Sequence, residues 1–420
     1  MMIAHPGRDR ALKGSLLIGC LLFGATAVRG QANGFWPQWR GPNRDNVSPD
    51  TGLLKKWPAE GPPSLWEAKG LGAGYSSVSV ADDKIFSMGD LKDGCYAIAL
   101  DIDGKPLWQT KIGPTGGGGP PGPRSTPTYE GGNLYVLGQS GDLTCLDARH
   151  GTIKWHKNLE RDFAGTMMSG WGYSESVLVD ADKVICTPGG PRGALLALNK
   201  NTGQELWRTK DWTDSAAYAS PIQVEIDGKR QYVQLTGESL GGVAADDGKV
   251  LWRTKRHGET AVIPTPVFRD NRVFVTSAYG IGCNLFKIAE DNGEFSVTEV
   301  YANKNMNNHH GGVILVGDYL YGFSDPELVC LEYQTGKVKW KNRSVGKGAL
   351  AYADRHLYLR AESSGAVALI EATPDGYRQV SQFTQPDRSR EPAWQHPVIT
   401  GGRLYLRDQD ILLCYDLEAK

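Results

Sequence analysis

The chain has 420 residues, a formal net charge of −1, 53 glycines, 12 tryptophans and 17 tyrosines. A nucleic-acid-binding surface needs dense Lys and Arg to meet phosphates, so this charge balance argues against nucleic acid as a partner. Abundant Gly and aromatic residues are typical of many short strands joined by tight turns, and an all-β domain can reach this length.

Residues 1–30 are predicted to be a secretory signal peptide. Three basic residues precede an apolar run at 15–28, and small residues follow it near Gly30. The apolar run is too short for a membrane span, so we expect a periplasmic or secreted protein with no transmembrane segment. Cys20 ends a stretch, Leu17 to Cys20, that resembles a lipoprotein box. Cys20 is therefore either a lipid anchor or a residue within the apolar run of the signal.

Residues 31–63 are interpreted as an N-terminal extension. They contain Trp-Pro-Gln-Trp-Arg-Gly-Pro-Asn at 36–43, whose role the sequence leaves open.

A repeat dominates the rest of the chain. Its pattern is an apolar strand, a turn that ends in Gly, three residues and then Trp. It occurs at Gly104/Trp108, Gly151/Trp155, Gly203/Trp207, Gly248/Trp252 and Gly336/Trp340, and with Val in place of Trp at Gly293/Val297 and Gly376/Val380. The period of these glycines, 40 to 52 residues, is typical of one four-stranded propeller blade.

Eight hairpins with alternating apolar residues accompany these seven glycines. Their turns begin at Asp82, Gly131, Ala181, Gly228, Asp270, Gly317, Ala353 and Gly401. The alternation is what half-buried antiparallel strands require. The eighth unit lacks its outer strand, and residues 64–70 supply one of the right kind. The sequence therefore predicts an all-β, eight-bladed propeller of four-stranded antiparallel blades over 64–420, closed by an N-terminal strand.

The repeat tryptophans are predicted to be structural. A large flat ring at the start of each outer strand fills the gap to the next blade, and its burial contributes on the order of 3 kcal/mol. The set is Trp66, Trp108, Trp155, Trp207, Trp252 and Trp340. Cys145, Cys330 and Cys414 share one repeat position, so we expect buried thiols rather than disulfides between blades.

These Gly-x-x-x-Trp units resemble the pyrroloquinoline-quinone-like (PQQ-like) repeat family, over nearly all of Trp66 to Leu417. The resemblance implies a propeller, and it covers both quinone-dependent alcohol dehydrogenases and non-enzymatic scaffolds, so fold does not decide function. In the dehydrogenases it implies a disulfide between adjacent cysteines under the quinone, Ca²⁺ ligands and an Asp base. This chain has no adjacent cysteines and no Cys-x-x-Cys-His haem motif.

The segments that precede the inner strands are the predicted ligand site, because they open near the propeller axis. They present aromatic and charged side chains suited to a flat ligand that carries a carboxylate. The candidates are Tyr75, Arg124, Tyr173, Glu175, Tyr218, His309, His310, Lys347, Trp394 and His396. The alternative is a set of turns with solvated polar tips.

Two further patterns were weighed in the same region. A metal bound by His309, His310 and His396 is disfavoured, because adjacent histidines on an extended chain point to opposite sides. The glycine-rich stretch 116–119 leads into a strand rather than a helix, so it is interpreted as a flexible loop or a lid, not a phosphate site.

The sequence thus favours an exported, non-enzymatic binding or scaffold module with a protein partner or a small molecule at the propeller face. No catalytic residue is assigned. The alternative is a quinone-dependent alcohol or sugar dehydrogenase that holds PQQ, with Ca²⁺, in the central funnel and uses Glu175 or His309 as the base.

Overall fold

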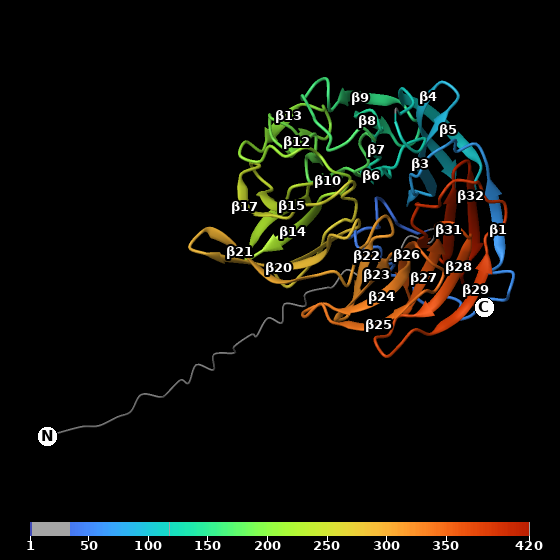
Figure 1. Cartoon of the computed structure of the whole chain (residues 1–420). Coiled ribbons are helices and arrows are strands. Elements are labelled where there is room, and N and C mark those ends of the chain that lie inside the picture. Colours follow the sequence, from blue (N-terminus) through green and yellow to red (C-terminus); the bar gives the residue numbers. More distant parts are fainter. Residues whose placement is uncertain (2–33, 117, 420) are drawn as a thin grey trace. The chain divides into compact units, whose positions relative to one another are not determined.

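The computed structural model describes Met1, residues 34–116 and residues 118–419. Within these ranges every regular element is a β-strand, and 32 strands form eight four-stranded antiparallel sheets. Figure 1 shows the sheets arranged as blades around a common axis. The predicted eight-bladed propeller is confirmed. The predicted signal peptide and Cys20 lie outside the described residues.

The first four blades are consecutive in the chain. Blade 1 holds β2 (Ser79–Ala81), β3 (Lys84–Leu91), β4 (Gly94–Asp101) and β5 (Pro106–Gly113). Blade 2 holds β6 (Thr128–Glu130), β7 (Asn133–Leu137), β8 (Asp142–Asp147) and β9 (Ile153–Asn158). Blade 3 holds β10 (Leu178–Asp180), β11 (Lys183–Cys186), β12 (Leu196–Asn199) and β13 (Glu205–Arg208). Blade 4 holds β14 (Ile222–Ile226), β15 (Lys229–Leu235), β16 (Ser239–Ala244) and β17 (Val250–Lys255).

The last four blades complete the ring. Blade 5 holds β18 (Val267–Arg269), β19 (Arg272–Ser277), β20 (Gly282–Asp291) and β21 (Glu294–Asn303). Blade 6 holds β22 (Val313–Val316), β23 (Tyr319–Ser324), β24 (Glu327–Glu332) and β25 (Val338–Asn342). Blade 7 holds β26 (Gly348–Ala353), β27 (His356–Ala361), β28 (Ala366–Glu371) and β29 (Gln379–Thr384). Blade 8 holds β30 (Val398–Thr400), β31 (Arg403–Asp408), β32 (Ile411–Asp416) and β1 (Ser64–Ala68).

The ring closes where the sequence predicted. Strand β1 pairs antiparallel with β32, with Trp66 opposite Cys414 and Ala68 opposite Leu412. This pairing removes the free edge that β32 would otherwise present. Closure therefore joins the two ends of the propeller within one blade.

The turn glycines and the tryptophans of the repeat contact one another across blades. A Cβ built on Gly151 would lie 2.6 Å from the ring of Trp108, and one on Gly248 would lie 2.3 Å from the ring of Trp207. Gly151 also has φ +73°, a backbone conformation that favours glycine. The glycine is therefore required twice, by its own turn and by the indole of the preceding blade.

Two blades depart from this pattern. The sequence placed Val297 at the tryptophan position of blade 5, but β20 and β21 are ten residues long, so the Gly293 turn lies farther out. Tyr301 takes the role instead: its ring would meet a Cβ on Gly336 at 2.7 Å, and its hydroxyl donates to the Tyr333 carbonyl at 3.0 Å. In blade 7, Phe383 contacts Gly61 in the same way, where Val380 was expected.

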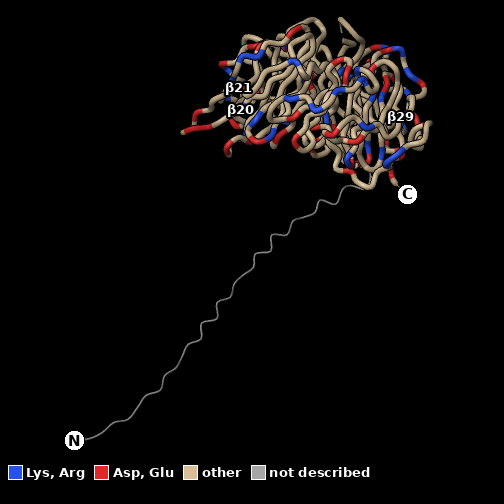
Figure 2. The backbone as a smooth tube through the Cα atoms, turned by 60° about the horizontal axis from the view of Figure 1, so that its bottom comes forward, with Lys and Arg blue, Asp and Glu red and all other residues tan. Residues whose placement is uncertain are grey.

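The core lies between the blades, in clusters of buried side chains that join neighbouring sheets. The six cysteines among the described residues are buried and form no disulfide, as expected for apolar packing. Figure 2 shows acidic and basic residues intermixed over the propeller, with acidic residues near the β20–β21 turn. All regular elements in the described ranges are strands, so these ranges contain no helix that is long and apolar enough to cross a membrane.

Candidate functional site

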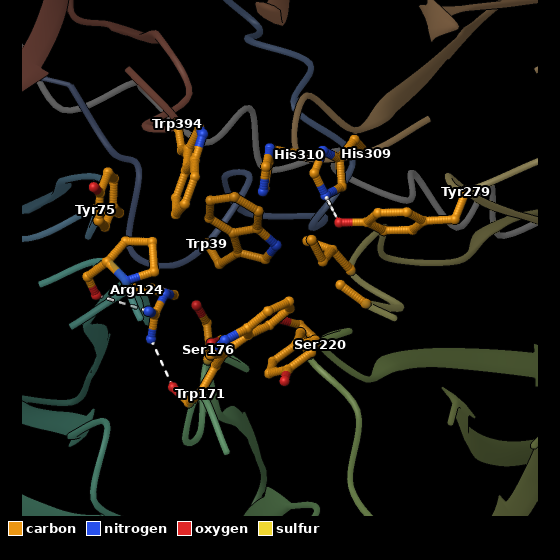
Figure 3. Close-up of a pocket in the computed structure, with 15 residues that line it drawn as sticks. Trp39, Tyr75, Arg124, Trp171, Ser176, Ser220, Tyr279, His309, His310 and Trp394 are labelled. Carbon is orange, nitrogen blue, oxygen red and sulfur yellow. Dashed lines mark hydrogen bonds between the residues drawn. The ribbon is translucent and has the colours of Figure 1, made fainter. Parts of the chain in front are cut away.

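A cavity of about 280 Å³ lies on the ring axis, among the segments that precede the inner strands (Figure 3). Six of the ten predicted residues line it: Tyr75, Arg124, Tyr218, His309, His310 and Trp394. The structure therefore brings together residues that are more than 300 positions apart in the chain.

The other four predicted residues do not line this cavity. Tyr173 is buried between blades 2 and 3, with its hydroxyl donating to the Pro188 carbonyl at 3.0 Å. Glu175 is buried and accepts from the Thr187 backbone N–H at 2.5 Å. Lys347 pairs with Glu362 at 3.1 Å. His396 is buried beneath Trp39, with 4.5 Å between ring centroids.

The N-terminal extension forms the floor of the cavity. Gly34 packs on Thr400 and Gly401, at the turn between β30 and β31, and Leu53 donates to Asp354, at the turn between β26 and β27. Both ends of the segment thus lie at the face that carries these turns. Between them, Trp39 reaches the cavity and stands at the centre of its lining side chains (Figure 3). The segment therefore closes the axis on one side.

Buried polar side chains hold this segment in the ring. Arg40 donates to the Val313 carbonyl in blade 6 at 2.6 Å, and Arg44 donates to the Ser176 and Val177 carbonyls beside blade 3 at 2.5 and 3.2 Å. Trp39 donates from Nε1 to Thr265 Oγ1 at 3.0 Å. Because Arg40 and Arg44 have φ near +60°, the segment adopts a backbone that needs such support.

A series of hydrogen bonds to side-chain hydroxyls, the hydroxyl ladder, joins blades 1 to 4, and two of its members, Ser176 and Ser220, line the cavity. The backbone N–H of Ser77 donates to Thr126 Oγ1, that of Thr126 to Ser176 Oγ and that of Ser176 to Ser220 Oγ, at 3.2, 2.8 and 2.9 Å. Each of these residues stands two positions before the first residue of its blade's inner strand. A small hydroxyl side chain at this position thus links each blade to the next.

An arc of rings forms the opposite wall. Trp394 stacks between Tyr75 and His310, with both centroid distances 4.2 Å and interplanar angles of 29° and 18°. His309 follows at 3.6 Å from His310, and its Nε2 lies 2.8 Å from the hydroxyl of Tyr279. Since its two neighbours cover both faces of Trp394, this indole turns an edge toward the cavity.

The charge of the cavity is set by one residue. Among the described residues that line it, Arg124 alone carries a formal charge at neutral pH, and its guanidinium donates to the Trp171 and Pro120 carbonyls at 2.9 and 2.8 Å. Burial lowers the pKa of His309 to about 3 and also lowers the pKa of His310, so both imidazoles are neutral.

The lining does not suit a calcium-bound quinone. Ca²⁺ takes six to eight oxygen ligands, with carboxylates prominent, whereas the described lining contains no Asp, Glu, Asn or Gln. Within the described part of the chain, no group of three or more His, Cys, Asp and Glu residues is arranged to hold a metal ion. No cysteine of the described residues faces the cavity, so the adjacent-cysteine platform of the dehydrogenases has no counterpart.

Sequence reasoning missed several lining residues, notably Trp39, Trp171 and Tyr279. Trp39 belongs to the 36–43 motif, and two tryptophans within four residues of an extension were the available signal. Trp171 stands two residues from Tyr173, and an extended chain would direct both side chains to the same face. Gly172 between them has φ +75°, so the chain turns there and only Trp171 reaches the cavity. Tyr279 lies in the turn between β19 and β20, which carried no signal of its own.

The family described as "Outer membrane protein assembly factor BamB", built on PQQ-like repeats, matches residues 94–342, more than half of the sequence. The chain belongs to this family. Members with that name from Burkholderia pseudomallei and Salmonella typhimurium are 29% and 25% identical over 191 and 195 residues, or 44% and 45% of this chain. The match with the Shewanella oneidensis member covers 56% of the chain at 22% identity. The chain spans 46%, 44% and 61% of these three relatives.

Solved structures with a similar fold include a BamB protein and an alcohol dehydrogenase. BamB from Moraxella catarrhalis superposes with a TM-score of 0.61 at 14% identity, over 85% of this chain and 98% of that one. A quinohemoprotein alcohol dehydrogenase from Comamonas testosteroni gives 0.62 at 11% identity, over 94% of this chain and 82% of the other. At these identities the likeness concerns the fold alone.

Proposed function

We propose that this chain is an exported, non-enzymatic binding module of the PQQ-like propeller family, with the axial cavity as its binding site. Residues 64–420 form the binding domain, and the 31–63 extension provides its floor. Export rests on the signal-like features of residues 1–30. A scaffold role with a protein partner is consistent with relatives that are named assembly factors.

The composition of the lining is the observation that carries this proposal. Convergent aromatic side chains with a few polar groups are typical of a ligand site. A dehydrogenase of the PQQ type would need a carboxylate base and oxygen ligands for Ca²⁺ at the same place. The described lining offers rings, serines and Arg124 and no carboxylate, which supports binding without turnover.

Neither Glu175 nor His309, the bases that the dehydrogenase alternative requires, is well placed for catalysis. Glu175 is held by Thr187 and Gln234 within the wall, behind the cavity surface. His309 does line the cavity, and its low pKa makes it a weak base at neutral pH.

A titration of the mature protein with PQQ, with and without Ca²⁺, tests the proposal, combined with an alcohol and sugar oxidation assay with an artificial electron acceptor. We expect no Ca²⁺-dependent binding and no dye reduction. Micromolar, Ca²⁺-dependent binding with alcohol-dependent dye reduction would overturn the proposal in favour of the dehydrogenase.

A further inference from the structure

We propose that the cavity selects a small aromatic molecule with one anionic group, a carboxylate in the simplest case, and that Arg124 binds the anion. This inference rests on the proposed function and names the ligand class of the same site. Four features of the lining support it: the free donors of Arg124, the free hydroxyls, the orientation of the rings and the size of the cavity.

Arg124 has unused hydrogen-bond donors and forms no salt bridge with a described residue, although Asp90 lies near enough to act on it electrostatically. A guanidinium carries five N–H donors, and the two bonds to the Trp171 and Pro120 carbonyls use two of them. None of the ion pairs among the described residues includes Arg124, although it is half-buried. A partly desolvated guanidinium without a salt-bridge partner favours an anion, because charge-assisted hydrogen bonds are about twice as strong as neutral ones.

The serine hydroxyls add further donors to the cavity. The oxygens of Ser176 and Ser220 each accept a backbone N–H from the hydroxyl ladder, at 2.8 and 2.9 Å. Their O–H protons remain available, since a hydroxyl has one donor besides its acceptor positions. Ser174 Oγ has no partner within the described protein. The hydroxyls of Ser176 and Ser220 can therefore donate to an anionic oxygen beside Arg124.

The rings favour the same sign of charge. An aromatic ring is negative on its face and positive at its edge, so a cationic ligand needs open faces. In the arc, Tyr75 and His310 cover both faces of Trp394, so this indole presents its positive edge (Figure 3). The edge of Trp394 thus favours an anion or the face of a ligand ring over a cation.

The size of the cavity limits the ligand. A volume of about 280 Å³ lies just below the usual range for small-molecule sites, which begins at about 300 Å³. It accommodates one or two fused rings with a short side chain. The ring system of such a ligand would stack over the indole of Trp39 on the floor of the cavity, while its anionic group would bind Arg124.

Three probes of one shape and different charge test the inference by calorimetric titration into the mature protein. Indole-3-acetate is the anion, indole-3-acetamide the neutral analogue and tryptamine the cation. We expect indole-3-acetate to bind at least tenfold more tightly than the amide, and tryptamine to bind most weakly. Equal binding of acetate and amide, or tighter binding of tryptamine, would overturn the anion assignment.

The Arg124→Gln variant separates a binding role from a structural one. We expect it to weaken indole-3-acetate binding to the level of the amide, with amide binding unchanged and with partial recovery in Arg124→Lys. Arg192→Gln, an exposed arginine outside the cavity, is the matched control and leaves the preference intact. If Arg124→Gln weakens acetate and amide equally, Arg124 only shapes the wall and the inference fails.

The outcomes also distinguish this inference from the proposed function. If the amide or tryptamine binds best, and Trp39→Ala abolishes that binding, the ligand class is wrong while the cavity remains the binding site. If none of the three probes binds the folded protein, both the ligand class and the binding function of the cavity are contradicted.

Discussion

The indole of Trp155 occupies the space where a side chain on Gly203 would stand. A Cβ on Gly203 would lie 2.9 Å from ring atoms Cδ2 and Cε3, and Trp155 Nε1 donates to the Lys200 carbonyl of the same turn at 2.8 Å. This contact joins blade 2 to blade 3. The Gly-x-x-x-Trp repeat therefore marks the interfaces between blades. In the units of Trp108, Trp155 and Trp207, the Trp of one blade packs on the turn Gly of the next blade along the chain.

Replacing Trp155 with alanine removes this interface. We expect the free energy of unfolding to fall by about 3–5 kcal/mol, because the lost ring leaves a cavity between the blades. Urea denaturation measures the change. Ile153→Ala is the matched control, an exposed residue of the same strand that should cost no more than about 0.5 kcal/mol. A loss below about 1 kcal/mol for Trp155→Ala would contradict the packing role.

Gly203→Ala tests the other side of the same contact. Gly203 has φ +69° and the indole at 2.9 Å, whereas Gly293 has φ +87° and no atom within 4 Å. Both Gly→Ala substitutions strain the backbone by about 1–2 kcal/mol, but only Gly203→Ala also overpacks a ring, by about 1–3 kcal/mol. Thermal or urea unfolding of the two variants should therefore differ by that second amount. Equal losses would show that the turn conformation alone requires glycine.

Arg44→Met tests how the N-terminal extension is held. The substitution leaves the buried carbonyl of Ser176 without the donor that Arg44 supplies, whereas the Val177 carbonyl keeps Thr128 Oγ1 as a donor. We therefore expect a loss of about 1–3 kcal/mol in unfolding free energy. Arg192→Met, at an exposed site, serves as the control and should be nearly neutral. Unchanged stability of Arg44→Met would mean that the extension docks without this residue.

The pH dependence of stability should carry the signature of Glu175. Burial raises the pKa of its carboxyl from 4.5 to about 7, against the nearby positive charge of Arg44. The folded state therefore holds a proton that the unfolded state has released between these pH values. Its stabilising contribution is present below pH 4.5 and is lost as pH rises through 7, by about 3 kcal/mol in total.

Glu175→Gln isolates this effect. Denaturant titrations between pH 5 and pH 8 should show the variant gaining stability relative to the wild type as pH rises. A stability difference that stays constant over this range would mean that Glu175 titrates normally in the folded protein.

Much of the ring could be predicted because its signals are local. Hairpins of alternating polarity repeat eight times, a turn glycine repeats seven times, and in five of these units an indole follows the glycine by four residues. These signals depend little on the rest of the fold. The prediction failed where length changed: the long β20–β21 hairpin moved the packing ring from Val297 to Tyr301. A fixed spacing of four residues after the turn glycine no longer identifies the packing residue when both strands of a hairpin are longer.

The site was harder to predict because it is assembled from every part of the chain. Residues before the inner strands were sound candidates, since propeller geometry directs them to the axis. Which of them face inward depends on the local turn: beside Gly172, with φ +75°, the predicted Tyr173 is buried between blades, whereas Trp171, which was not predicted, lines the cavity. Trp39 could not be assigned at all, because an extension has no repeat that fixes where it docks.

The central claim is that this propeller binds a ligand in the axial cavity above Trp39. Its most direct test is the set of indole N–H signals of the ¹⁵N-labelled protein, recorded by NMR during titration with indole-3-acetate. The account predicts that the signals of Trp39, Trp171 and Trp394 shift, while those of Trp108 and Trp155, between the blades, stay in place. Shifts confined to the inter-blade tryptophans, with the three cavity signals unmoved, would contradict it.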